Sequence, residues 1–324
     1  MAKIQPAVST ILINVEPETS GYADLSQCAS IVNRRFYRQG LNWAVSGFRG
    51  NNAAVSAGGR ISIEKLPETW VMSNAWHKIF AHWRKQQQEA LDDSGQESVR
   101  AAFNDFKIYM DTAHVAAGDT GTFSANLLPV KSGGGSFLTG SDGSTLTAEW
   151  QPSQVVIPNA AADASGSEVD AAEFYLHMVG SGSTATSKGI IEGYSNSRAL
   201  PISPDPQLRP NTNNQEYNWL RAMFDVGNDD QEVLQNVSER NNEVSYPHEA
   251  YPGGGIMASV LQLHAHTDIS ATINAVDNSF FMPGTQVPCG LLKIKNDTNK
   301  TLELFIDLVP GHHRGYLCEP MQEF

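Results

Sequence analysis

Short runs of β-branched and aromatic residues, separated by turn residues, recur along most of the chain. The first run, AVSTILINV at residues 7–15, stops at Glu16-Pro17, and such bounded apolar runs are typical of strands. Similar runs predict further strands at residues 42–48, 60–66, 106–111, 146–157, 173–179, 189–194, 260–269, 286–295, 302–309 and 316–321. Residues 25–38 fit either a helix or a loop that leads into a strand.

Helical periodicity is confined to two excursions. In residues 68–103, apolar positions recur at i, i+3, i+4 and i+7, and these positions are Trp76, Ile79, Phe80 and Trp83. Asn74, or Ser73 before it, is the expected N-cap, and Ser94-Gly95 is expected to break the helix before a second short one that ends at Phe103. Residues 216–224 and 229–239 also have helical spacing.

Many strands without alternating βαβ order indicate a sandwich or barrel. We therefore predict an all-β protein in which residues 1–324 form one single jelly-roll domain, with helical insertions at about 70–103 and 216–240. A double jelly roll is an alternative, although the long helix and the uneven strand spacing make it less attractive.

Charged residues make up 18% of the chain, against roughly 25% in an average soluble protein. Such a weakly charged surface suits a protein that is largely covered by copies of itself, because interface centres are depleted in charge. The formal net charge of −13 argues against electrostatic wrapping of nucleic acid, and the first six residues contain a single Lys rather than a basic arm. Any contact with nucleic acid must then depend on a local patch.

The three cysteines, Cys28, Cys289 and Cys318, are spaced for neither a disulfide framework nor a CxxC metal site. A reducing compartment is the simplest inference. We recognise no signal peptide and no apolar run of the ~20 residues that a membrane-spanning helix needs, so we expect no membrane insertion.

The motifs of common enzyme classes are missing from the sequence, which favours a non-enzymatic structural protein with no catalytic residue. The glycine runs at residues 133–135 and 253–255 lack the Lys-Ser/Thr of a phosphate-binding loop, so turns are the better interpretation. The sequence likewise predicts no cofactor.

Two segments contain residue types that bind metals. His264 and His266 alternate in a predicted strand, so both imidazoles are expected on one face, and residues 312–313 add two more. Without a nearby Cys or carboxylate at ligand spacing, a solvated or interface pair is the stronger interpretation. Residues 225–232 are acidic and could contribute to a structural Ca²⁺ site, although helix-terminal carboxylates are the simpler reading.

The densest basic cluster is NRRFYR at residues 33–38, in which Arg34, Arg35 and Arg38 are interleaved with aromatic residues. Guanidinium groups bind phosphates and aromatic rings stack on unpaired bases, so the cluster is a candidate site for single-stranded nucleic acid. A subunit contact explains the same residues equally well, because Arg, Tyr and Phe are also enriched at interfaces.

A set of segments in this order is similar to the capsid proteins of small circular single-stranded DNA viruses that encode replication proteins. The segments are VNRRFYRQG, LPETWVMSNAWHKIFAHW, FNDFKIYMDTAHV, EWQPSQVVIPN, KGIIEGYSNSR, WLRAMFDVGNDDQEVLQN and YPHEAYPGG. The resemblance implies a jelly-roll coat protein that assembles with itself into an icosahedral shell around single-stranded DNA, and a virion protein made inside the host cell. Many such relatives carry a basic N-terminal arm, which this chain lacks.

A carbohydrate-binding or hydrolytic β-sandwich is the rival from another functional class. In that case Trp70, Trp150 and Trp219 would be exposed and would form a platform for sugar rings.

Overall fold

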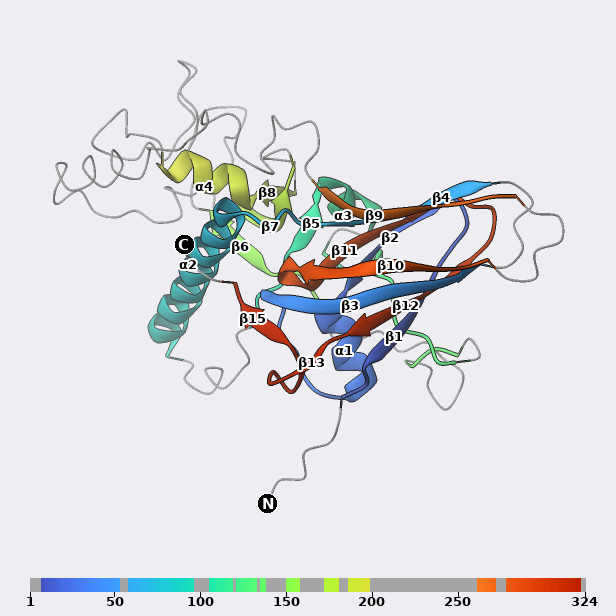
Figure 1. Ribbon diagram of the computed structural model, residues 1–324. Coiled ribbons are helices and arrows are strands. Elements are labelled where there is room, and N and C mark those ends of the chain that lie inside the picture. Colours follow the sequence, from blue (N-terminus) through green and yellow to red (C-terminus); the bar gives the residue numbers. More distant parts are fainter. Residues whose placement is uncertain are drawn as a thin grey trace, which may run out of the picture. The chain divides into compact units, whose positions relative to one another are not determined.

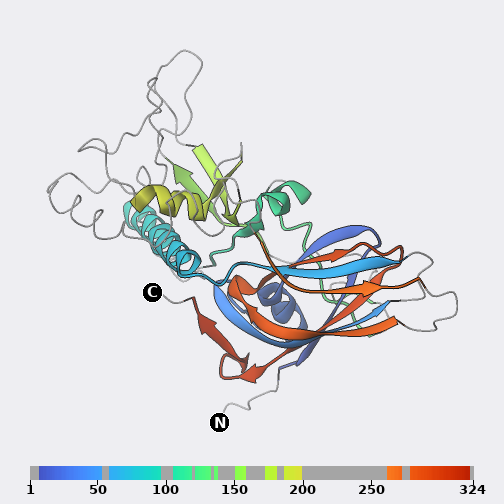
Figure 2. The same ribbon diagram turned by 45° about the horizontal axis from the view of Figure 1, so that its top comes forward.

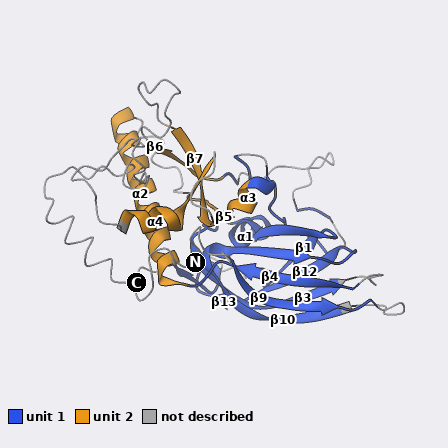
Figure 3. Cartoon of the chain, turned by 90° about the horizontal axis from the view of Figure 1, so that it is seen from above, with its two compact units in different colours: residues 1–68, 116–151, 261–322 blue, residues 69–115, 152–260, 323–324 orange. Residues whose placement is uncertain are grey.

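The chain folds into two compact units, coloured separately in Figure 3. The first comprises residues 1–68, 116–151 and 261–322, and the second comprises residues 69–115, 152–260 and 323–324. The computed structural model describes residues 7–52, 58–95, 105–118, 121–132, 135–137, 150–157, 172–180, 186–198, 261–271 and 278–321.

Two antiparallel sheets make up most of the first unit (Figure 1). Sheet A has the order β1 (Thr10–Val15), β12 (Leu302–Leu308), β3 (Leu41–Asn52) and β10 (Asn278–Val287), and β15 (Cys318–Pro320) also pairs with β3. Sheet B has the order β2 (Thr19–Asp24), β11 (Leu291–Asn296), β4 (Gly59–Lys65) and β9 (Gln262–Ile269). The first unit is therefore an all-β sandwich, which confirms the predicted fold class at that level.

The strands of this sandwich pair in a nested order. The first strand, β1, pairs with β12, and inside this pair come β2 with β11, β3 with β10 and β4 with β9. Consecutive strands alternate between the two sheets, except that β4 and β9 both lie in sheet B. Apart from residues 323–324, the second unit falls between β4 and β9 in the sequence, together with residues 116–151.

Alternation of side chains creates the core between the sheets. In β1 the buried residues Ile11, Ile13 and Val15 lie opposite Ile306, Leu304 and Leu302 of β12. The facing layer contributes Ile61, Ile63, Leu292 and Ile294, all in the same apolar cluster. Figure 2 shows the two layers of the sandwich. Full burial of such side chains stabilises the fold by about 1.5–3 kcal/mol each.

Residues 126–131 cover the edge of both sheets on the β1 and β2 side. The Leu127 N–H donates to the Tyr22 carbonyl of β2 at 2.6 Å, and the Val130 N–H donates to the Leu12 carbonyl of β1 at 2.9 Å. Unpaired strand edges can template further pairing, so this segment removes two of them.

Residues 25–38, left open by the sequence, form a helix followed by a loop. Helix α1 (Leu25–Asn33) begins at Asp24, whose carboxylate accepts hydrogen bonds from the backbone N–H groups of Ser26 and Gln27. It ends at Arg34, which adopts the left-handed conformation with φ 55°. The following loop leads to β3 at Leu41.

The described part of the second unit combines a small sheet with helices. It contains α2 (Trp70–Ser94), β5 (Tyr109–Asp111), β6 (Gln154–Ile157), β7 (Ala172–Val179), β8 (Ser187–Gly189) and α4 (Ile190–Arg198), and α3 (Thr112–Ala117) spans the boundary between the units. Strand β7 pairs in parallel with β5 and β8 and antiparallel with β6. The second antiparallel sandwich of a double jelly roll is thus not found among the described residues.

Helix α2 confirms the predicted aromatic stripe. Trp76, Ile79 and Trp83 are buried, and the Trp76 and Phe80 rings stack at 4.9 Å. The helix ends at Gly95 in the left-handed conformation, as expected. The predicted N-cap at residues 73–74 is wrong, because the Thr69 hydroxyl caps the helix four residues earlier by accepting from the Met72 N–H.

Three other expectations differ from the structure. Residues 189–194, predicted as a strand, mostly belong to α4, whose residues Ile190, Ile191 and Tyr194 are buried at helical spacing. The strand predicted at 286–295 is divided by a turn, η3 (Pro288–Gly290), between β10 and β11. Strand β2 was not predicted, because its sequence TSGYAD is polar and contains glycine. The insertion predicted at about 216–240 lies outside the described residues, and the single-domain organisation stays a prediction.

Candidate nucleic-acid interface

The predicted basic cluster lies on the loop that joins α1 to β3. Arg34 and Arg38 are exposed and Arg35 is half-buried. The Arg34 guanidinium donates to the Phe137 carbonyl at 3.3 Å, whereas no hydrogen bond or ion pair joins Arg38 to another described residue. The cluster is therefore a surface feature at one end of the sandwich.

A hairpin from the other end of the sequence joins this loop and adds a fourth arginine. Strands β13 (Pro310–Gly311) and β14 (Gly315–Tyr316) flank Arg314, which is exposed and has φ 52°. The Arg314 guanidinium donates to the Phe36 carbonyl, and the Arg314 carbonyl accepts from the Tyr37 hydroxyl at 2.9 Å and from Arg35 at 3.5 Å. Loop and hairpin thus hold one another reciprocally; we call this arrangement the arginine clasp.

A set of hydrogen bonds anchors the clasp to the first residues of the sandwich. Asn33 at the end of α1 donates from its amide to the Tyr316 hydroxyl at 2.7 Å and accepts from the Val8 N–H at 3.0 Å. The Tyr316 hydroxyl in turn donates to the Val8 carbonyl at 2.7 Å. The clasp therefore forms only when α1, β14 and the segment before β1 are all folded.

Three aromatic rings lie buried beneath the clasp, whereas Phe36 is half-buried. Tyr37, Trp43 and Tyr316 are no more than 1% exposed, and their ring centroids are 5.4–5.9 Å apart. Burial raises the pKa of Tyr316 to about 12, so its phenol stays protonated. Tyr37 consequently cannot stack on a base in this conformation, contrary to the role that we inferred from the interleaved aromatics.

Arg34, Arg38 and Arg314 differ in their partners from two arginines of the sheets. Arg49 forms a bidentate ion pair with Asp307, and Arg60 forms a bidentate ion pair with Asp268. For Arg34, Arg38 and Arg314, no carboxylate lies within ion-pairing distance in the part of the chain that the structure describes. The side chains of Arg34 and Arg314 donate to backbone carbonyls, which carry no formal charge.

The pKa of His313, beside Arg314, is affected by burial and by this arginine's charge. Burial, together with the charge of Arg314, lowers the pKa of His313, so this imidazole is neutral near pH 7. The run His312-His313-Arg314 is itself a basic signal in the sequence, but nothing local indicates that it packs against residues 33–38. Sequence reasoning therefore missed Arg314.

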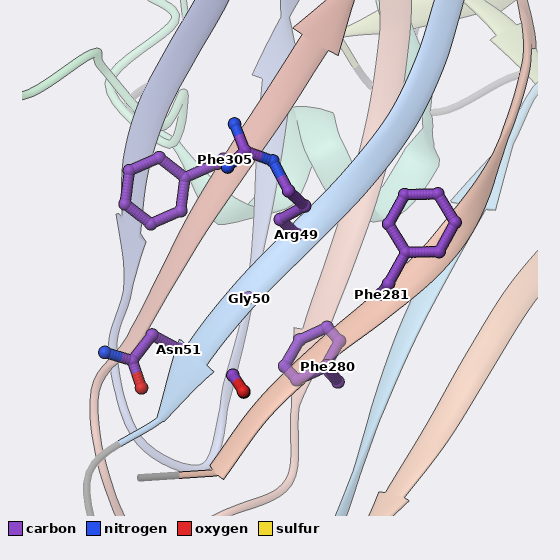
Figure 4. Close-up of a pocket in the computed structure, with 7 residues that line it drawn as sticks. Arg49, Gly50, Asn51, Phe280, Phe281 and Phe305 are labelled. Carbon is purple, nitrogen blue, oxygen red and sulfur yellow. The ribbon is translucent and has the colours of Figure 1, made fainter.

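A second candidate is a depression of about 510 Å³ beside strands β3, β10 and β12 of sheet A (Figure 4). Its lining residues are Arg49, Gly50, Asn51, Ser279, Phe280, Phe281 and Phe305. Phe281 is 66% exposed, and the Arg49 guanidinium lies 5.5 Å from the Phe305 ring centre while it is paired with Asp307. Because this arginine is paired with Asp307, the depression offers no uncompensated positive charge.

The predicted histidine pair is not on one face. The register of β9 against β4 passes from Ile63 opposite Ala265 to Glu64 opposite Leu263, which leaves His264 as the extra residue of a bulge. The His264 ring lies 2.8 Å from the Pro283 carbonyl and contacts Phe48, whereas His266 is exposed. The bulge breaks the alternation on which the prediction depended.

The described residues give little support to a sugar platform or a metal site. Trp150 is 7% exposed, and its indole N–H donates to Asp24 at 3.1 Å, so the expectation that it is exposed is wrong; Trp219 lies outside the described residues. No cluster of three or more His, Cys, Asp or Glu side chains suited to a metal ion occurs among the described residues, and residues 225–232 lie outside them. No helix in the described ranges is both long and apolar enough to cross a bilayer.

Comparison with known proteins adds no relative. No protein-family model matches the chain, and neither a curated protein nor a solved structure matches it.

Proposed function

We propose that this chain is a viral capsid (coat) protein with a jelly-roll fold, which assembles with itself into an icosahedral shell around a small single-stranded DNA genome. In this proposal the protein is made inside the host cell, is located in the virion and acts structurally rather than as an enzyme. The arginine clasp contacts the genome.

The nested strand order is the observation that carries the proposal. A jelly roll is an eight-stranded, two-sheet fold, and rolling up one long antiparallel ribbon pairs its first strand with its last and its middle strands with each other. The pairs β1·β12, β2·β11, β3·β10 and β4·β9 follow this scheme. Coat proteins, lectins and cupins share the jelly roll, so the fold alone does not select among them.

Surface chemistry favours a coat protein among these classes. Large apolar side chains are exposed on the sandwich, with Phe281 at 66%, Leu263 at 53% and Leu317 at 41%. Charge is sparse at 18% of residues, and the segments similar to capsid proteins of small circular DNA viruses run through most of the chain. Closed symmetry converts many modest contacts of this kind into a stable shell.

Negative-stain electron microscopy of the purified recombinant protein, combined with size-exclusion chromatography, tests the proposal. We expect uniform round shells that elute near the void volume. Identical fractions from host cells without the gene control for host particles. A monodisperse monomer at every pH, salt and Ca²⁺ concentration tried would overturn the proposal.

A further inference from the structure

The arginine clasp presents hydrogen-bond donors that its own contacts do not use up. A guanidinium has five N–H donors arranged as a planar fork, and none of them can be deprotonated in a protein. Among the described residues, the Arg34 side chain donates to one carbonyl, that of Phe137, and the Arg314 side chain also donates to one carbonyl, that of Phe36. Both side chains are exposed. Each therefore keeps N–H donors that are not bonded to a described group.

Positive charge at this place is unusual for a chain with a formal net charge of −13. The Arg35 guanidinium donates to the Arg314 carbonyl at 3.5 Å, and Arg34 precedes Arg35 in the loop, so three like charges belong to two segments that contact one another. An anion that neutralises several guanidiniums at once would relieve the repulsion among these charges. Phosphate fits best, because two of its oxygens match the guanidinium fork and give bidentate, charge-assisted bonds.

The positions of the aromatic rings restrict how a nucleic acid can be read. Stacking on bases requires exposed ring faces. Tyr37 and Tyr316 are buried under the clasp, where they hold Arg314 and the segment before β1 in place. These two tyrosines accordingly offer no face to a base, and the arginines offer contacts to the backbone of a strand.

We propose that Arg34, Arg35 and Arg314 form a binding site for the phosphate groups of a polynucleotide, which holds the strand by its backbone irrespective of base sequence. This inference deepens the proposed function, on which it rests for the identity of the bound strand. It assigns Arg314, rather than Arg38, as the third arginine of the site.

Salt dependence of binding is the measurement that tests the site. The affinity of the full-length protein for fluorescent 20-nucleotide dT and dC oligomers is measured by anisotropy over a range of NaCl concentrations. For single strands, the slope of log K against log[salt] is about −0.7 for each phosphate neutralised. We expect Arg314→Gln and Arg34→Gln each to reduce the magnitude of the slope by about 0.7 for both oligomers.

Three further variants or probes make the result specific. Arg84→Gln removes the same charge from an exposed position of α2 and is expected to leave the slope unchanged. Arg314→Lys keeps the charge but lacks the fork, so it should retain the slope while the affinity falls. Inorganic phosphate at equal ionic strength should compete more strongly than chloride. Thermal unfolding of each variant shows whether it is folded, and Arg34→Gln, which loses one carbonyl contact, serves if Arg314→Gln does not fold.

Several outcomes would overturn the site. These are absence of oligomer binding at low salt, an equal change of slope with Arg84→Gln, or a strong preference for one base. Electron microscopy of the same variants separates this inference from the proposed function. Shells that form while oligomer binding is independent of the clasp would reject the site alone, whereas clasp-dependent binding by a permanent monomer would reject the shell alone.

Discussion

At the scale of single residues, Asp24 shows how a buried charge organises one end of the sandwich. Its carboxylate is 1% exposed and accepts hydrogen bonds from Ser26, Gln27, Gln39 and Trp150. Burial raises the pKa of Asp24, whereas these hydrogen bonds oppose the rise. A buried carboxylate without such donors would be strongly destabilising. Asp24 therefore caps α1 and at the same time ties the loop before β3 to residue 150.

Asp24→Asn should lower the free energy of unfolding by about 2–4 kcal/mol, because an amide NH₂ would then face N–H donors and leave buried groups unsatisfied. Urea unfolding followed by tryptophan fluorescence at pH 7 measures the effect. Asp93→Asn, at an exposed position of α2, is the matched control and should change stability by less than about 0.5 kcal/mol. Equal stability of Asp24→Asn and the wild type would show that these hydrogen bonds contribute nothing net.

At the scale of elements, strands and helices with a repeating apolar pattern are predictable from the sequence. Features that depend on contacts between distant segments are not. Alternation in β1 and β12 and the helical stripe of α2 are local patterns, and both are found. The alternation of residues in the sequence does not predict the bulge at His264, because the extra residue depends on the pairing of β9 with β4. For the candidate site, residues 33–38 were identified from their composition, but Arg314 is 279 positions from Arg35 and joins it only through the hairpin fold.

The close approach of strands β3 and β10 at Gly284 gives a prediction at the scale of elements. A Cβ at Gly284 would lie 2.2 Å from the Val45 carbonyl oxygen and 2.5 Å from the Ser46 carbonyl carbon. Both are backbone atoms of β3, so they cannot move without breaking its pairing with β10. Gly284→Ala should therefore cost more than about 2 kcal/mol of stability, since overpacking against backbone has no rotamer to relieve it.

Soluble yield and melting temperature measure this effect. Gly135→Ala is the control, because the nearest atom to its added Cβ is 3.8 Å away, in the flexible side chain of Lys131. We expect the control to behave as the wild type. A melting temperature of Gly284→Ala equal to that of the control would contradict the close approach of β3 and β10.

At the scale of the whole molecule, the proposed shell must form from subunits that repel one another. A formal net charge of −13 on each copy opposes assembly, and the same charge opposes the approach of a polynucleotide. The exposed apolar side chains act in the other direction and do not depend on ionic strength in this way. Assembly and genome contact are thus expected to respond to salt with opposite signs, because the clasp attracts phosphate while the subunits as a whole repel.

Raising NaCl from roughly 0.05 M to roughly 0.5 M shortens the screening length from more than 10 Å to less than 5 Å. We expect the assembled fraction of nucleic-acid-free protein, measured by sedimentation velocity, to increase over this range because subunit repulsion is screened. Over the same range, oligomer bound at the clasp should be released. Sucrose at matched osmolality, which screens no charge, controls for crowding and water activity. Shells that dissociate as salt rises would instead mean that ion pairs between subunits, rather than apolar contacts, hold the shell together.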